Sequence, residues 1–332
     1  MKTWSRRKFA LSLAAFSGLI KSHAQELASQ ARRSLTGFVY DERYLRHDVA
    51  RLHPESPRRL EAILREMDRT GLSARVSRLP IDLDPMPWIG EIHAPEHIAA
   101  IRTIPVTGDV AALAVAGALS GVKAVCEGTM RNAFCAIRPP GHHARNTRQE
   151  EGFCYYNNIA IAARYAQKRF GLKRVLIIDW DYHHGNGTEE AFYEDPSVLY
   201  FSMHNWHAYP FTGDPRRTGK GAKAGLNINV HLRCGANEYA MFAAWNDRLM
   251  PAVEKFKPEL VLISAGFDAR KDDPLGCFAV SDIGFGELTK RAMAIARAHA
   301  GGRLVSLLEG GYDCEGLGKA VCAHVTALLS SS

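Results

Sequence analysis

Several short runs of this chain are apolar almost throughout, and helical patterns separate most of them. Val175–Ile178 and Leu260–Ser264 are two of these runs, and neither alternates between apolar and polar residues. A strand that is covered by helices on both faces has this composition, and such strands are typical of parallel sheets. The chain is therefore expected to form an α/β fold whose sheet lies buried between helices.

Eight runs are candidate strands. They are Gly37–Tyr40, Val76–Leu79, Phe134–Ile137, Val175–Ile178, Val198–Ser202, Leu226–Val230, Leu260–Ser264 and Leu304–Leu308, and the helical stretches between them include Val110–Ala124, Ile159–Phe170, Glu238–Phe256 and Phe285–His299. This alternation predicts a single α/β domain with a parallel sheet of about eight strands, flanked by helices and joined by right-handed crossovers. In such a sheet the functional residues lie just beyond the carboxyl ends of the strands.

The composition is that of an ordinary globular chain. Of the 332 residues, 46% are apolar and 23% are charged, which excludes a collagen-like, coiled-coil or disulfide-dense protein. No apolar run reaches the ~18 residues that a membrane span requires. The seven cysteines, which contain no CxxC pair, are Cys126, Cys135, Cys154, Cys234, Cys277, Cys314 and Cys322. We therefore expect mostly buried free thiols, with no disulfide framework and no cysteine zinc site.

The positive net charge is concentrated in the first 24 residues. The whole chain carries +7, and residues 1–24 carry +5 because they contain Lys2, Arg6, Arg7, Lys8 and Lys21 and no acid. The remainder of the chain therefore carries +2. This balance gives no support to a phosphate-binding surface, and no nucleic-acid partner is predicted.

Residues 1–24 have the order of a secretory signal. A basic segment with paired arginines precedes the apolar stretch Phe9–Ile20, which is too short to span a bilayer comfortably, and Lys21–Ala24 follows. The segment resembles a twin-arginine signal, which exports folded proteins, although Ala10 stands where such signals more often carry leucine. A basic amphipathic helix is the alternative. We expect cleavage after Ala24, a periplasmic location and no stable membrane insertion once the signal is removed.

Acidic and histidine residues follow one of the predicted strands. Side chains alternate along an extended chain, so Asp179, Asp181 and His183 are expected to point the same way. A carboxylate and an imidazole can chelate one cation, and zinc needs a third ligand while it keeps a place for water. Asp268, just after another predicted strand, is the candidate third ligand. A strand-end turn with local hydrogen bonds is the alternative.

Two further polar segments follow predicted strands. In Arg138–Ala144 a Pro-Pro-Gly turn presents His142 and His143, and histidine can take up and return a proton near neutral pH. In Glu309–Tyr312 two glycines permit a tight turn that would bring a phenol into a site, where its hydroxyl could hold an oxyanion. Taken singly, adjacent histidines also occur in surface turns, and a buried core tyrosine is the simpler interpretation of Tyr312.

Together these segments resemble the zinc-dependent histone deacetylase family, which includes bacterial amidohydrolases and acetylpolyamine deacetylases and has the arginase/deacetylase fold. The resemblance extends from about Tyr40 to Val325 and includes HPESP at 53–57, EIHAPE at 91–96 and GFCYYNN at 152–158. It implies a catalytic domain over residues 36–328. Related arginases use two manganese ions and need a further carboxylate two positions after the ligand histidine, where this chain has Gly185. This difference favours a single metal.

The resemblance also implies a role for each reactive residue. The implied ligands of one zinc ion per chain are Asp181, His183 and Asp268, and the implied catalytic residues are His142, His143, Asp179, Asn186 and Tyr312. His143 would be the general base and then the general acid, while His142, oriented by Asp179, would assist electrostatically. Asn186 matches the partner of His143. Many relatives have an aspartate at this position, and the asparagine resembles the class II and bacterial branches of the family. Tyr312 matches the tyrosine that stabilises the oxyanion.

Substrate-binding and potassium-binding residues are implied in the same way. The substrate residues are Gly152, Phe153, Tyr209 and Leu275, and the potassium residues are Asp179, Ser202, Met203, Phe192, Asp195 and Val198. Phe153 and Tyr209 match two aromatic residues that line a tunnel for a methylene stem, although the second is usually phenylalanine, and core packing is the alternative for both. Iron(II) is a second candidate metal, because two carboxylates and one histidine do not strongly exclude it.

Three functions are consistent with these residues. The first is a zinc-dependent amide hydrolase that removes acetyl or similar acyl groups from an amine, so that its partner is a small acylated amine or acyl-lysine. The second is an acetylpolyamine deacetylase, but relatives of that type tend to place an acidic residue where this chain has Leu275, which cannot attract a distal ammonium. Asp272 and Asp273 lie close by in the sequence. The third is a small-molecule-binding protein on the same scaffold, although no reactive residue is missing.

Overall fold

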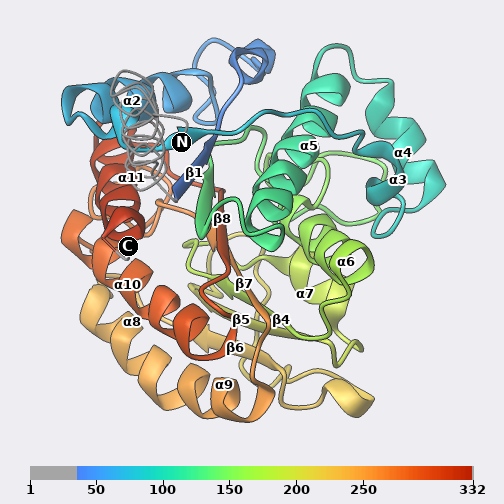
Figure 1. The fold of residues 1–332 in the computed structure, drawn as a ribbon, viewed down its shortest axis with the longest axis vertical. Helices are drawn as coiled ribbons and strands as arrows, with labels where there is room; N and C mark the ends of the chain where they lie inside the picture. The colour runs from blue at the N-terminus through green and yellow to red at the C-terminus, as the bar shows by residue number, and fades with distance from the viewer. Residues whose placement is uncertain (1–35, 331–332) are drawn as a thin grey trace, which may run out of the picture. The chain divides into compact units, whose positions relative to one another are not determined.

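The computed structural model describes residues 36–330, and a parallel sheet runs through their centre (Figure 1). Its strands are β1 (Thr36–Val39), β2 (Ser77–Arg78), β3 (Asn132–Cys135), β4 (Val175–Asp179), β5 (Val198–His204), β6 (Asn227–His231), β7 (Leu260–Ala265) and β8 (Leu304–Leu308). They pair in the order β2-β1-β3-β8-β7-β4-β5-β6, and every pairing is parallel. The predicted eight-stranded parallel sheet is confirmed. The predicted signal segment 1–24 lies outside the described residues.

Helices cover both faces of the sheet, as the apolar strands require. The helices are α2 (Arg58–Arg69), α3 (Met86–Ile89), α4 (Pro95–Arg102), α5 (Thr107–Cys126), α6 (Asn158–Phe170), α7 (Asn186–Phe192), α8 (Glu238–Ala244), α9 (Met250–Phe256), α10 (Asp282–His299) and α11 (Cys314–Leu329). In Figure 1, α2, α10 and α11 lie on one side of the sheet, and α5 and α6 lie on the other. Within residues 36–330, α5 is the single helix long and apolar enough to cross a membrane, and most of it is buried in this fold.

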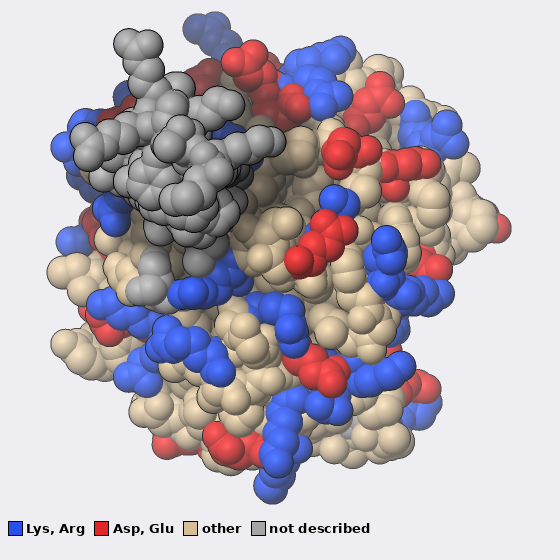
Figure 2. All heavy atoms as spheres, viewed as in Figure 1, with Lys and Arg blue, Asp and Glu red and all other residues tan. Residues whose placement is uncertain are grey.

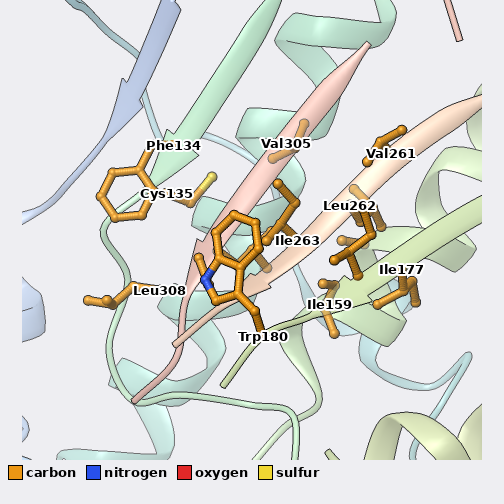
Figure 3. Packing of buried hydrophobic residues seen from close by; sticks show 14 of the residues in the cluster. Phe134, Cys135, Ile159, Ile177, Trp180, Val261, Leu262, Ile263, Val305 and Leu308 are labelled. Carbon is orange, nitrogen blue, oxygen red and sulfur yellow. The ribbon is translucent and has the colours of Figure 1, made fainter. Parts of the chain in front are cut away.

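The core extends to the last residue of each central strand. All residues of β4, β7 and β8 are buried. Trp180, directly after β4, is also fully buried and belongs to the apolar cluster drawn in Figure 3, together with Ile263 and Val305. Because side chains alternate along an extended chain, an indole in the core places the preceding and following residues, Asp179 and Asp181, on the opposite side.

The predicted helix Glu238–Phe256 is continuous but not regular. It consists of α8, a π-helical turn at Trp245–Leu249 and α9. Pro251 lies at the start of α9. Proline lacks the N–H that an α-helix requires, and its ring crowds the carbonyl four residues earlier. The wider turn accommodates this residue within one helical segment.

The sequence predicts mostly buried free thiols and no disulfide framework, and this is wrong for one pair of cysteines. Cys234 and Cys277 form a disulfide with a Cα–Cα distance of 5.0 Å. The two residues are 43 positions apart and lie in loops after β6 and β7, so their proximity comes from the fold and leaves no local spacing signal. The other five are free, and three of these are buried: Cys135, Cys154 and Cys322.

A buried ionic cluster connects α2 to the end of β3. Both oxygens of Glu55 accept hydrogen bonds from Arg138, and Arg59 donates to the same carboxylate at 3.0 Å. All three side chains are fully buried. Burial alone would raise the pKa of Glu55, but Arg138, the hydrogen bond to His47 and Arg59 lower it far below its usual value.

We predict that Glu55→Gln lowers the free energy of unfolding by about 3–5 kcal/mol at pH 7, because it leaves two buried guanidinium groups without their carboxylate. The pKa of Glu55 is depressed in the folded protein, so its contribution is complete above the unfolded value of about 4.5 and falls as the pH drops below that value. Urea unfolding between pH 3 and pH 7 should show the difference between variant and parent narrowing below about pH 4.5. Glu61→Gln, at an exposed position of α2, is the control. A difference that stays constant over this range would contradict the prediction.

Candidate active site

The predicted reactive residues follow four strands that are neighbours in the sheet. The order β3-β8-β7-β4 brings together the segments that carry the histidine pair, Tyr312, Asp268, and the pair Asp181 and His183. The strands end in register, since Asp179 of β4 pairs with Ser264 of β7, and Ser264 pairs with Leu307 of β8. Residues that are 170 positions apart in the sequence therefore meet at one edge of the sheet.

Asp181, His183 and Asp268 form a compact cluster. One ligand atom from each residue lies within 4.8 Å of the others. The Nδ1 atom of His183 is 2.9 Å from Asp268 Oδ2 and 3.3 Å from Asp181 Oδ1. A Cβ atom at Gly266 or Gly310 would collide with these carboxylates, so both glycines are needed for the cluster to form.

The electrostatics of this cluster fit a divalent cation. Burial and the neighbouring carboxylate of Asp181 raise the pKa of Asp268 to about 7. Burial would lower the pKa of His183, but Asp181 and Asp268 raise it to about 10. Two buried carboxylates that share one imidazole repel each other, and a divalent ion bound between them would relieve that repulsion. The alternative of a simple strand-end turn does not account for Asp268, which comes from a different strand.

The two adjacent histidines have different hydrogen-bond partners. His142 Nδ1 is 3.1 Å from Asp179 Oδ2, and His143 Nδ1 is 2.8 Å from Asn186 Oδ1. Burial would lower the pKa of His142, but Asp179, Asp181 and Glu309 raise it to about 10. Burial and the nearby His142 lower the pKa of His143 well below its usual value.

Glu309, to which the sequence analysis assigns no role, holds the turn that carries the histidines. Its Oε2 atom accepts hydrogen bonds from the backbone N–H groups of Gly141 and His142, at 2.7 Å and 3.2 Å. Its Oε1 atom accepts one from the hydroxyl of Ser264 at 3.1 Å. The carboxylate is fully buried. The only sequence signal was its place at the start of the segment that ends in Tyr312.

A cavity of about 670 Å³ opens from the reactive residues to the surface. Its lining includes His143, His183, Tyr312, Phe153, Tyr209, Gly152 and Leu275. Tyr209 is 40% exposed and its ring lies 5.0 Å from that of His143, so it belongs to the cavity wall and not to the core. Phe153 packs edge-on against Tyr312 with 5.8 Å between ring centres, and Leu275 is 38% exposed. The structure thus brings all four predicted substrate residues to one cavity.

The residues predicted to bind potassium belong to β4, to β5 and to the turn between α7 and β5. Asp179 and Ser202 are register partners on β4 and β5, and Ser202 Oγ lies 2.7 Å from His204 Nδ1. Met203 follows on β5. Phe192, Asp195 and Val198, which form the second predicted potassium site, lie at the turn between α7 and β5, where the N–H of Asp195 donates to Phe192 O and the N–H of Val198 to Asp195 O. Potassium binding at these positions stays a prediction.

Comparison with known proteins identifies the family. The histone deacetylase domain matches residues 103–328 of this chain. A probable deacetylase of Archaeoglobus fulgidus is 37% identical over 298 residues, which are 85% of this chain and 82% of the relative. This chain belongs to the histone deacetylase family.

Other relatives give the same family and fold. Histone deacetylases 5 and 18 of Arabidopsis thaliana are each 34% identical to this member of the family, over 90% and 92% of its length. The chain spans about half the length of these two plant relatives, 49% and 48%. The crystal structure of the HD domain of HDA15 superposes with a TM-score of 0.83 at 33% identity. The match covers 90% of this chain and 88% of the HDA15 chain.

We predict that Asp268→Ala weakens zinc binding by more than about 100-fold, because one of three candidate ligands is lost. Zinc content after dialysis against a zinc buffer, measured by mass spectrometry, should fall from about one ion per chain to near zero. Asp272→Asn is the matched control, since this carboxylate is close in sequence but exposed. Repeating the dialysis with an iron(II) buffer compares the two candidate metals. Unchanged zinc affinity of Asp268→Ala would contradict the ligand assignment.

Proposed function

We propose that this deacetylase-family protein is a zinc-dependent amide hydrolase that removes acetyl or similar acyl groups from an amine such as acyl-lysine. The observation that carries the proposal is that a histidine base, a candidate metal ligand and a phenol face one cavity, namely His143, His183 and Tyr312. The apolar wall formed by Phe153 and Tyr209 suits the methylene stem of a lysine or diamine.

A zinc ion held by Asp181, His183 and Asp268 would polarise the amide carbonyl and lower the pKa of a water molecule toward ~7. His143 is the base in this proposal. Because the oxygen of Asn186 can only accept, Nδ1 of His143 carries a proton and Nε2 keeps its lone pair. Nε2 takes the proton of the attacking water and then gives it to the amine nitrogen as the carbon–nitrogen bond breaks.

The other two reactive side chains stabilise charge. Burial raises the pKa of Tyr312 well above 10, so its hydroxyl stays protonated and can donate to the oxygen of the tetrahedral intermediate. His142 stays protonated beside Asp179 and places a positive charge next to the developing negative charge. We further propose that potassium binds at the predicted sites and supports the segment that carries Asp179.

A zinc-loaded protein that starts at Gln25 should hydrolyse an acetyl-lysine peptide faster than acetylspermidine or acetylputrescine, because Leu275 presents no charge to a distal ammonium. A trifluoroacetyl-lysine reporter completes the panel. Tyr312→Phe should lower kcat by about 100-fold or more, since it removes one oxyanion donor.

Each other outcome of this panel has a defined meaning. Preference for acetylspermidine would favour the acetylpolyamine alternative. Turnover of the activated reporter alone would place the natural substrate among other acyl groups. No turnover with zinc bound would favour a binding protein, and full activity of Tyr312→Phe would contradict the mechanism.

We propose that the substrate is a small acylated amine or acyl-lysine and not a nucleic acid. Acidic and basic side chains both occur across the face seen in Figure 2, in agreement with the near balance of charge after residue 24. A basic surface that follows a phosphate backbone would instead need a single sign of charge over a large area.

We also propose that the protein is exported through a twin-arginine signal. Support comes from the paired arginines Arg6 and Arg7 and from the disulfide between Cys234 and Cys277, because disulfides are rare in the cytosol and persist in the periplasm. In a bacterial host, the Arg6→Lys/Arg7→Lys variant should stay in the cytoplasm while the parent reaches the periplasm, as judged by fractionation and immunoblotting. Equal periplasmic yields of the two proteins would contradict the proposal.

A further inference from the structure

The segment that carries Tyr312 has little intrinsic rigidity. Tyr312 follows Gly310 and Gly311. Gly311 adopts a φ of 120°, which residues other than glycine rarely adopt. Two consecutive glycines leave many backbone conformations open to the unfolded and the locally mobile chain. The position of the phenol must therefore be held by contacts from outside the turn.

One buried carboxylate supplies such contacts. Asp273 Oδ2 accepts hydrogen bonds from the backbone N–H groups of Tyr312, at 2.7 Å, and Asp313, at 3.2 Å. Its second oxygen, Oδ1, accepts one from the N–H of Leu275 at 3.0 Å. Asp273 is only 7% exposed. A hydrogen bond to a charged acceptor is stronger than one between neutral groups. Because the donors are backbone N–H groups, these bonds fix the position of the main chain itself.

Asp273 therefore connects two segments with different tasks. Tyr312 lies after β8 and donates to the reacting oxygen in the proposed function, whereas Leu275 lies after β7 and forms part of the cavity wall. Arg59 supports the same turn from the other side, since it donates to Gly311 O and lies 5.0 Å from the centre of the Tyr312 ring. Among the described residues Arg59 has no hydrogen bond to Leu275, whereas Asp273 accepts hydrogen bonds from the N–H groups of both Tyr312 and Leu275.

We propose that Asp273 is a positioning residue that sets the place of the Tyr312 hydroxyl and of Leu275 through one carboxylate. This inference rests on the proposed function, in which Tyr312 acts as the oxyanion donor. The competing interpretation is that Asp273 only supports the start of α11, because Asp313 is the N-terminal cap of that helix and its side chain already accepts from Gly316 N.

A double-mutant cycle separates these interpretations. In zinc-loaded protein, Asp273→Ala should lower kcat for the acetyl-lysine peptide by about 10- to 100-fold when Tyr312 is present. In the Tyr312→Phe background the same change should lower kcat less than about threefold, because the hydroxyl that Asp273 positions is already absent. An equal loss in both backgrounds, or no loss when Tyr312 is present, would overturn the proposal.

Substrate preference tests the second half of the proposal. Asp273→Ala and Leu275→Ala should shift the ratio of kcat/KM for the acetyl-lysine peptide to that for acetylputrescine in the same direction. The double variant should shift the ratio no further than the larger single effect. If Leu275→Ala changes this ratio and Asp273→Ala does not, Asp273 does not position Leu275.

Three controls keep the result interpretable. Asp272→Asn changes the neighbouring, exposed carboxylate and should retain the activity of the parent. If Asp273→Ala does not fold, Asp273→Asn replaces it in the same cycle, because the amide has the shape of the carboxylate but only one acceptor oxygen. If Tyr312→Phe alone leaves kcat unchanged, the proposed function fails. If that variant has a lowered but measurable kcat and the cycle is additive, only this inference fails.

Discussion

The site depends on burying four carboxylates at one edge of the sheet without leaving any of them unsupported. Asp179, Asp181, Asp268 and Glu309 are all fully buried, and an isolated charge in such a place would be strongly unfavourable. Two kinds of partner offset this cost: imidazoles, such as His142 beside Asp179, and backbone N–H groups that point at carboxylate oxygens. The need for those partners determines which residues can stand at the strand ends.

Backbone donors make the sheet part of the site. The N–H of Gly310 donates to Asp181 Oδ2 at 2.8 Å, and the N–H of Tyr182 donates to Asp268 Oδ1 at 2.8 Å. These donors come from segments that directly follow strands of the sheet, Gly310 after β8 and Tyr182 after β4. Of the three candidate ligands, His183 lines the cavity, while Asp181 and Asp268 are fully buried behind it and each accepts a hydrogen bond from the backbone.

Local sequence patterns were sufficient to predict the parallel sheet, and they placed the segments that carry the candidate reactive residues directly after its strands. The strand Leu304–Leu308 was predicted with the bounds that β8 has, because a fully buried parallel strand shows a continuous apolar run. The disulfide of Cys234 and Cys277 and the role of Glu309 were missed. Their partners lie 43 positions or more away in the chain, and a contact at that distance leaves no periodic pattern.

Asn186 is an uncharged partner for a histidine that lies beside a second histidine. The rings of His142 and His143 are 4.0 Å apart, and Asp179, Asp181 and Glu309 raise the pKa of His142 to about 10 against the effect of burial. In the proposed function His143 is the base, which must be neutral when it takes a proton, and a carboxylate partner would favour its protonated form. Asn186 fixes the same tautomer through its oxygen at 2.8 Å but adds no charge. One histidine of the pair can then carry the positive charge while the other remains free to accept a proton.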